Sequence, residues 1–117
     1  MTPRAFVDLL KAFAFSSAAA EADYYATSHS SHPAEHLERF SAWFQGLGPS
    51  QQEVAHEVLR HAHEHSLFDL LTLLDSPGPL AEERGTFELW FVSEGGERVR
   101  LNDPGGEPLN ELFGNFA

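Results

Sequence analysis

Histidine is the most frequent reactive residue type in this 117-residue sequence, which contains seven His and no Cys. Four of the histidines lie between residues 56 and 65. His61 and His65 are four residues apart, so on a helix their rings project from one face at a separation that can chelate one metal ion. Glu57 and Glu64 could add carboxylate oxygens there. The spacing predicts a candidate site for zinc or a similar divalent metal at His61, His65, Glu57 and Glu64.

The remaining histidines, His29, His32 and His36, form a second cluster. His32 and His36 could join the first cluster in one metal site between helices. Residues 56–60 begin like a metalloprotease helix, but that motif requires His where Arg60 stands. The sequence also contains no nucleophile elbow, phosphate-binding loop or dinucleotide fingerprint. A non-catalytic protein without a cofactor is therefore favoured, and the alternative is a His-rich metal-binding domain or metal-dependent enzyme.

The charge of the chain restricts its partners. Eighteen Asp and Glu stand against seven Lys and Arg, which gives a formal net charge of −11. That balance argues against binding nucleic acid or an anionic membrane through a basic surface. No apolar run approaches the ~20 residues that a membrane span needs. The absence of cysteine is compatible with a reducing compartment, so we expect a cytoplasmic protein of bacterial type.

Negative charge is densest at the C-terminal end, where residues 75–117 hold nine acidic residues and three Arg. The same region contains Trp90. Aromatic anchors in an acidic field suit a binder of a basic protein, because charge steers the encounter and aromatic side chains hold the complex. The sequence thus predicts a protein-interaction module, for example an inhibitor or immunity-type partner. The predicted partner-binding residues are Trp90, Glu88, Glu94, Glu97 and, as a secondary candidate, Phe15.

The elements that must position these residues form an α+β fold. We expect a single compact domain over residues 1–117, with three to four packed helices followed by a C-terminal β-hairpin and a short terminal helical turn. The helices are predicted at about 3–23, 33–45, 50–65 and 66–75, the hairpin at about 86–102 and the helical turn at about 108–113.

The third helical region contains a fault in its apolar pattern. The apolar residues of 54–62 share one face, whereas those of 67–74 share another, displaced by roughly 130° on an ideal helix. A break with Ser66 as the new cap is slightly favoured over one continuous helix. Ser50 and Glu53 form a capping box that predicts the start of this region. On a continuous helix His56 and His63 are expected to be partly buried and hydrogen-bonded.

Apolar faces of the first two helices are predicted to be buried. In the first helix this face includes Leu9 and Phe13, while Phe15 falls on the polar side, where it is either covered by another element or kept for a partner. The buried stripe of the second helix is predicted to be Leu37, Phe40 and Phe44, with Trp43 and His36 beside it.

The hairpin is predicted to turn through a two-residue Gly95-Gly96 loop. That loop places Val92 opposite Val99 and Trp90 opposite Leu101. Both faces of the first strand are apolar, so each should be covered. A third hypothesis is a homodimer in which two hairpins pair edge to edge, because an isolated two-stranded hairpin is marginal in water.

Overall fold

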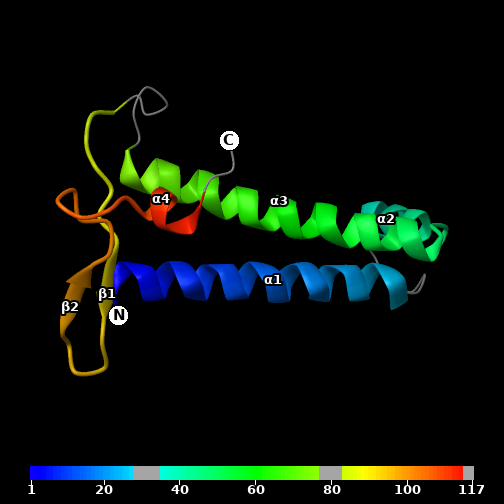
Figure 1. Cartoon of the computed structure of the whole chain (residues 1–117), viewed down its shortest axis with the longest axis horizontal. Coiled ribbons are helices and arrows are strands. Elements are labelled where there is room, and N and C mark those ends of the chain that lie inside the picture. The colour runs from blue at the N-terminus through cyan, green and yellow to red at the C-terminus, as the bar shows by residue number, and fades with distance from the viewer. Residues whose placement is uncertain (28–34, 77–82, 115–117) are drawn as a thin grey trace. The chain divides into compact units, whose positions relative to one another are not determined.

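The computed structural model describes residues 1–27, 35–76 and 83–114. The elements are α1 (Pro3–Thr27), α2 (Glu35–Gln45), α3 (Pro49–Asp75), β1 (Trp90–Val92), β2 (Arg98–Arg100) and α4 (Leu109–Phe113) (Figure 1). This architecture confirms the predicted α+β class, with a C-terminal hairpin and a short terminal helix. His29, His32 and the predicted helix start at Pro33 lie outside the described residues.

The chain divides into two compact units. Unit 1 comprises residues 1–12 and 65–117, and unit 2 comprises residues 13–64. Helices α1 and α3 each contribute residues to both units, and each unit has its own cluster of buried apolar side chains. The expectation of one domain over residues 1–117 stays a prediction.

Helix α3 is continuous from Pro49 to Asp75, so the predicted break at Ser66 is wrong. The two displaced apolar faces serve different clusters. Ala55 and Leu59 belong to the cluster of unit 2, whereas Leu67 and Leu71 belong to that of unit 1. Because each face has its own cluster, and no Gly or Pro interrupts residues 50–75, the helix can bury both faces without breaking.

The two long helices start with different caps. At α1, Thr2 Oγ1 accepts a hydrogen bond from Ala5 N at 3.0 Å, as its position before Pro3 indicates. At α3, the predicted Ser50 capping box is wrong by two positions. Gly48 supplies the first helical carbonyl, and its N–H donates to Gln51 Oε1 at 3.2 Å. Pro49 thus becomes the first helical residue, where its missing N–H costs nothing.

Helix α4 completes the core of unit 1 and confirms the helical turn predicted at residues 108–113. Leu109, Leu112 and Phe113 are buried beside Val7 and Leu71. Figure 1 shows α4 lying beside the C-terminal part of α3.

Asp75 fixes the start of α4 from the end of α3. Its carboxylate accepts hydrogen bonds from the backbone N–H groups of Leu109 at 3.1 Å and Asn110 at 2.9 Å. These are donors that the first turn of a helix cannot satisfy internally, so Asp75 acts as a cap supplied from a distant part of the chain.

Asn102, which is 7% exposed, ties the hairpin to α3. Its Nδ2 donates to the carbonyls of Leu74 at 3.0 Å and Phe87 at 2.8 Å. Its Oδ1 accepts from Leu89 N at 2.8 Å and from Arg100 Nε at 3.4 Å. One buried amide therefore satisfies polar groups on three separate segments.

The predicted register of the hairpin is wrong by one residue. The observed pairs are Trp90 with Arg100, Phe91 with Val99 and Val92 with Arg98. Gly96 N donates to Ser93 O at 2.9 Å, and Gly96 has a φ of 85°. The loop therefore contains three residues, Glu94 to Gly96, and ends on a glycine in the left-handed region. The extra residue shifts the facing pairs.

The strands are also less covered than predicted, because all three residues of β1 are exposed. The base of the hairpin is where it docks: Leu101 is buried, and Leu89 packs against the core of unit 1. Leu101 N donates to Leu89 O at 2.8 Å, which extends the pairing toward that core.

The core of unit 2 is smaller and contains Tyr25, Phe44 and Ala55. Gln45 Nε2 donates to the carbonyl of Tyr25 at 3.0 Å. Gln52 Nε2 donates to the carbonyls of Phe44 at 3.2 Å and Leu47 at 3.3 Å. Side-chain amides thus satisfy backbone carbonyls near the ends of α1 and α2.

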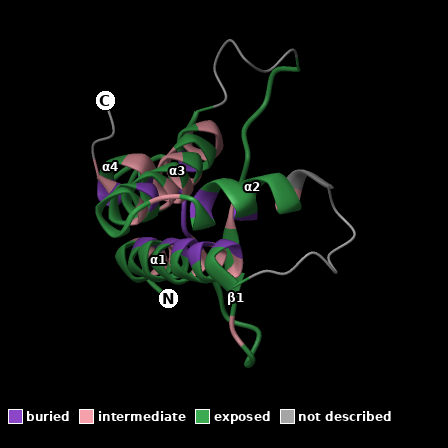
Figure 2. Cartoon of the chain, turned by 90° about the vertical axis from the view of Figure 1, so that its right-hand side faces the viewer, coloured by how far each residue is buried: buried purple, intermediate pink, exposed green. Residues whose placement is uncertain are grey.

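The buried stripe of α1 differs from the prediction. It consists of Val7, Ala14, Ala18, Ala22 and Tyr25, which lie along one side of the helix (Figure 2). Leu9 and Phe13, predicted to be buried, are 56% and 65% exposed. Alanine positions rather than the larger apolar residues therefore form most of the packed face.

Candidate functional site

Unit 2 contains an open apolar groove with a volume of about 810 Å³. Three helices and the connection between α2 and α3 contribute to its walls. Tyr25 comes from α1, Phe40 and Trp43 from α2, Leu47 from the connection, and Val54 and Val58 from α3. The walls are mainly apolar, and among the described residues that line the groove Glu21 is the charged one.

Helix α2 divides its aromatic side chains between core and groove. Phe44 is 1% exposed, whereas Phe40, one turn earlier, is 47% exposed and Trp43 is 61% exposed. The predicted burial of Phe40 is therefore wrong. On α3, Val54 and Val58 are 57% and 61% exposed. Large side chains thus line the groove without a covering element among the described residues.

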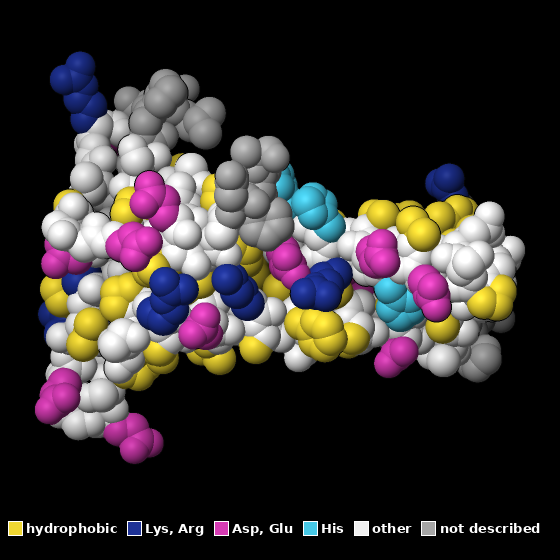
Figure 3. Space-filling model, in the orientation of Figure 1, with side chains coloured by type: hydrophobic (Ala, Val, Ile, Leu, Met, Phe, Trp, Pro, Cys, Tyr) yellow, Lys and Arg dark blue, Asp and Glu magenta, His cyan; other side chains and the backbone are white. Residues whose placement is uncertain are grey.

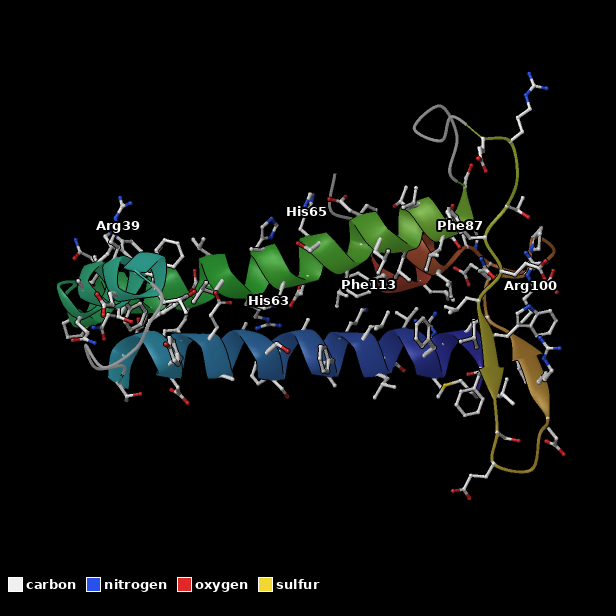
Figure 4. All side chains as sticks on the ribbon, turned by 180° about the vertical axis from the view of Figure 1, so that it is seen from behind. Arg39, His63, His65, Phe87, Arg100 and Phe113 are labelled. Atoms are coloured by element: carbon white, nitrogen blue, oxygen red, sulfur yellow. The ribbon has the colours of Figure 1, made fainter. Side chains whose placement is uncertain are left out.

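A hydrogen-bonded group of three side chains borders the groove. Glu21 Oε1 accepts from the Tyr25 hydroxyl at 2.5 Å, and Glu21 Oε2 lies 2.6 Å from His63 Nε2. His63 points from α3 toward α1 (Figure 4). Because an ionised carboxylate only accepts, the His63 Nε2 must carry the proton. The prediction that His63 is partly buried and hydrogen-bonded is confirmed.

These contacts change the acidity of both partners on α1. Partial burial alone would raise the pKa of Glu21, but hydrogen bonds from Tyr25 and His63 and the charge of protonated His63 outweigh it, so the pKa is lowered. Burial and the bond to the Glu21 carboxylate raise the pKa of Tyr25 to about 12. The group is thus stable as carboxylate and neutral phenol at neutral pH.

Two of the predicted partner-binding residues of the hairpin, Trp90 and Glu88, lie close to arginines. Trp90 is 39% exposed, its indole N–H donates to Glu88 Oε1 at 3.1 Å, and the Arg98 guanidinium lies 4.8 Å from its ring centroid. Arg100 Nη1 is 3.8 Å from Glu88 Oε1. The Trp90 surface therefore combines an aromatic ring with arginines rather than with carboxylates alone.

The other predicted interaction residues are exposed. Glu94 and Glu97 lie on either side of the two glycines of the hairpin turn. Phe15 is 57% exposed, and the Arg60 guanidinium lies 5.3 Å from its ring centroid. Phe15 is thus contacted by Arg60 and remains more than half exposed.

The predicted metal ligands are not gathered into a site. No group of three or more His, Asp or Glu among the described residues is arranged to hold a metal ion. Glu64 Oε1 accepts from Arg60 Nε at 2.8 Å, and His65 Nδ1 lies 3.4 Å from Asp69 Oδ2. Glu57 and His61 are exposed on α3. His56, predicted to be partly buried, is exposed, with its ring centroid 5.7 Å from that of Phe44.

No helix within the described parts of the chain combines the length and apolarity needed to cross a membrane. No family model, curated protein or solved structure matches this chain. The function of the chain is therefore inferred from the chemistry of its own surfaces.

Sequence reasoning missed the groove. Phe40, Trp43 and Phe44 all fall within one arc of α2, so their spacing predicts burial and contains no signal that two of them stay open. The His63–Glu21 pair joins residues 42 positions apart and has no local signature. A detectable sign was the four-residue spacing of Glu21 and Tyr25, which brings their side chains together on a helix.

Proposed function

We propose that this chain is a non-catalytic protein-interaction module, of the inhibitor or immunity type, that binds a basic protein. The observation that carries the proposal is the open apolar groove of unit 2, with Trp43 more than half exposed. Exposed aromatic side chains in a concave apolar surface are typical anchors of protein interfaces.

Charge supports the choice of partner. Residues 13–64, which form unit 2, contain seven Asp and Glu, two Arg and no Lys. An acidic surface accelerates association with a basic partner and opposes binding to an acidic one. The proposal sets this encounter in the cytoplasm, with which a chain lacking cysteine is compatible.

The Glu21 group beside the groove connects two helices. Both carboxylate oxygens of Glu21 are engaged, one by Tyr25 and the other by His63. These two hydrogen bonds hold the carboxylate between a neighbour one turn away on α1 and His63 on α3. The group therefore supports a structural role, in which it joins α1 to α3 beside the groove.

The test is affinity capture from cells of the source organism, followed by purification of the captured protein. Wild type, Trp43→Ala and Trp90→Ala are compared at low and high salt. We expect one basic protein that is retained at low salt, is released at high salt and is lost by one of the two tryptophan variants. Capture of no basic protein, or binding that is indifferent to salt and to both substitutions, would contradict the proposal.

A further inference from the structure

Resting on this proposed function, we infer that the occupant of the unit 2 groove is an amphipathic α-helix of the partner, with an apolar stripe flanked by Lys or Arg. Three features of the groove favour this occupant: the helical backbone of its walls, its openness and its charged border.

The walls of the groove exclude an extended peptide as the matching ligand. Of the eleven described residues that line the groove, ten lie in α1, α2 or α3, where most backbone N–H and C=O groups are bonded within the helix. An extended strand needs backbone partners and would leave its polar groups unsatisfied against this apolar surface. A helix satisfies its own backbone and presents only side chains. The groove thus accepts apolar side chains such as Leu or Phe that a bound helix presents at positions i, i+3 or i+4, and i+7.

The openness of the groove argues against a small apolar molecule. Its volume of about 810 Å³ lies within the range of small-molecule sites, but such sites bury most of the ligand. Here Trp43, Val54 and Val58 remain 57–61% exposed. A long ligand that covers these side chains from outside removes more apolar surface from water than a small molecule lying among them.

The border of the groove supplies the charge complementarity. The exposed Glu53 and Glu57 directly precede Val54 and Val58 on α3, and Glu21, which is paired with His63, lines the groove. Carboxylates lie beside hydrophobic side chains on the face of the molecule seen in Figure 3. Of the two arginines in unit 2, Arg60 is paired with Glu64, and Arg39 points outward from α2 (Figure 4). Lysine side chains on the flank of a bound helix that faces α3 would meet Glu53 and Glu57.

A second copy of this chain fits less well. It would bring the same acidic excess to the groove, and like charges across an interface oppose association. Its exposed apolar residues Leu9 and Phe13 lie on α1, where residues 1–20 contain Arg4, Lys11 and Asp8. This net charge of +1 falls short of a stripe with Lys or Arg along both flanks.

The test uses three synthetic peptides of about five helical turns that contain no tryptophan. The first has Leu at i, i+4 and i+7 with Lys on both flanks, the second replaces each Lys by Glu, and the third has the residues of the first in an order that destroys the stripe. In a Trp90→Phe background Trp43 is the sole tryptophan, so its emission reports occupation of the groove.

We expect the Lys peptide to shift the Trp43 emission to shorter wavelength, to become helical on binding and to bind at least about tenfold more tightly than either other peptide. In the wild-type background, Trp43→Ala and Val58→Lys should each weaken binding by about tenfold or more, whereas Trp90→Ala should leave it unchanged. Both groove substitutions replace exposed side chains, and unchanged thermal unfolding confirms that the variants fold.

Four results would overturn the inference: absence of Lys-peptide binding, equal binding of all three peptides, insensitivity to both groove variants, or a sedimentation mass of two chains that reverts to one in Trp43→Ala. A fifth is binding of the apolar dye anilinonaphthalene sulfonate at Trp43 that saturating Lys peptide does not displace. A basic partner that is captured through Trp90 but ignores Trp43 would leave the proposed function standing and remove the groove helix alone.

Discussion

The two units differ in how completely a short helix covers the apolar side chains of α1 and α3. In unit 1 the short helix α4 buries Leu109, Leu112 and Phe113 over the apolar residues of α1 and α3. In unit 2 the longer helix α2 buries Phe44 but leaves Phe40 and Trp43 open. The five-residue helix α4 thus completes the core of unit 1, whereas the eleven-residue helix α2 leaves apolar side chains of unit 2 exposed. Helix length therefore does not determine whether a core is covered, and the proposed partner is placed on the exposed apolar surface of α2.

The difference between a covered and an open core is tested most directly within α2, where one of two phenylalanines one turn apart is buried and the other is exposed. Phe44→Ala should lower the free energy of unfolding by about 3–5 kcal/mol, because it empties a fully packed position. Phe40→Ala, at a position 47% exposed, should cost about 1 kcal/mol or less. Urea unfolding followed by circular dichroism measures both. Equal losses for the two variants would show that Phe40 is part of a closed core and that the groove is covered.

Unit 1 is stabilised by the buried side chain of Asn102 as well as by apolar packing. Substitutions of two asparagines test this contribution. Asn102→Ala should cost about 3 kcal/mol, because the carbonyls of Leu74 and Phe87 and the N–H of Leu89 lose their partner. Asn110→Ala is the control, since its side-chain amide makes one bond of 3.3 Å to Thr72 Oγ1. It should cost about 1 kcal/mol or less.

Hydrogen exchange gives the Asn102 experiment a local readout. The Leu89 N–H should exchange faster in Asn102→Ala than in Asn110→Ala, relative to the other protected amides of unit 1. Similar unfolding costs and similar Leu89 exchange in both variants would mean that the amide of Asn102 does not join the hairpin to α3.

The features that were predicted correctly are those determined by local sequence patterns. The Thr2-Pro3 start of α1, the docking of Leu109, Leu112 and Phe113, and the hairpin itself follow from capping, apolar spacing and turn composition. The hairpin register failed because a Gly-Gly pair fits both a two-residue and a three-residue loop, and the additional loop residue moves every facing pair.

Long-range features could not be predicted in the same way. The pattern fault near Ser66 was real, but it marks a change of cluster along one helix rather than a helix end. The bonds of Asp75 to α4 and of Asn102 to Leu74 join residues about thirty positions apart, and nothing in their spacing announces them. Trp43 remains exposed at the groove, and the residue type alone does not indicate whether another element will cover it.

The smallest expected effect concerns the Glu21 group, which joins α1 to α3 in the open unit and has no counterpart of the same kind in unit 1 among the described residues. Because the pKa of Glu21 is lowered on folding from its ordinary value of 4.5, its ionised form stabilises the native state above that value, and the contribution is lost as pH falls through the lowered pKa. Glu21→Gln should therefore cost about 0.5 kcal/mol near neutral pH, a small figure because the group is partly exposed, and the cost should vanish in stronger acid. Thermal or urea unfolding across the acid range measures the difference, with Glu38→Gln on α2 as the control for removal of one exposed carboxylate. A difference between wild type and Glu21→Gln that stays constant through the acid range, or that Glu38→Gln reproduces, would show that the bonds to Tyr25 and His63 do not stabilise unit 2 through the charge of Glu21.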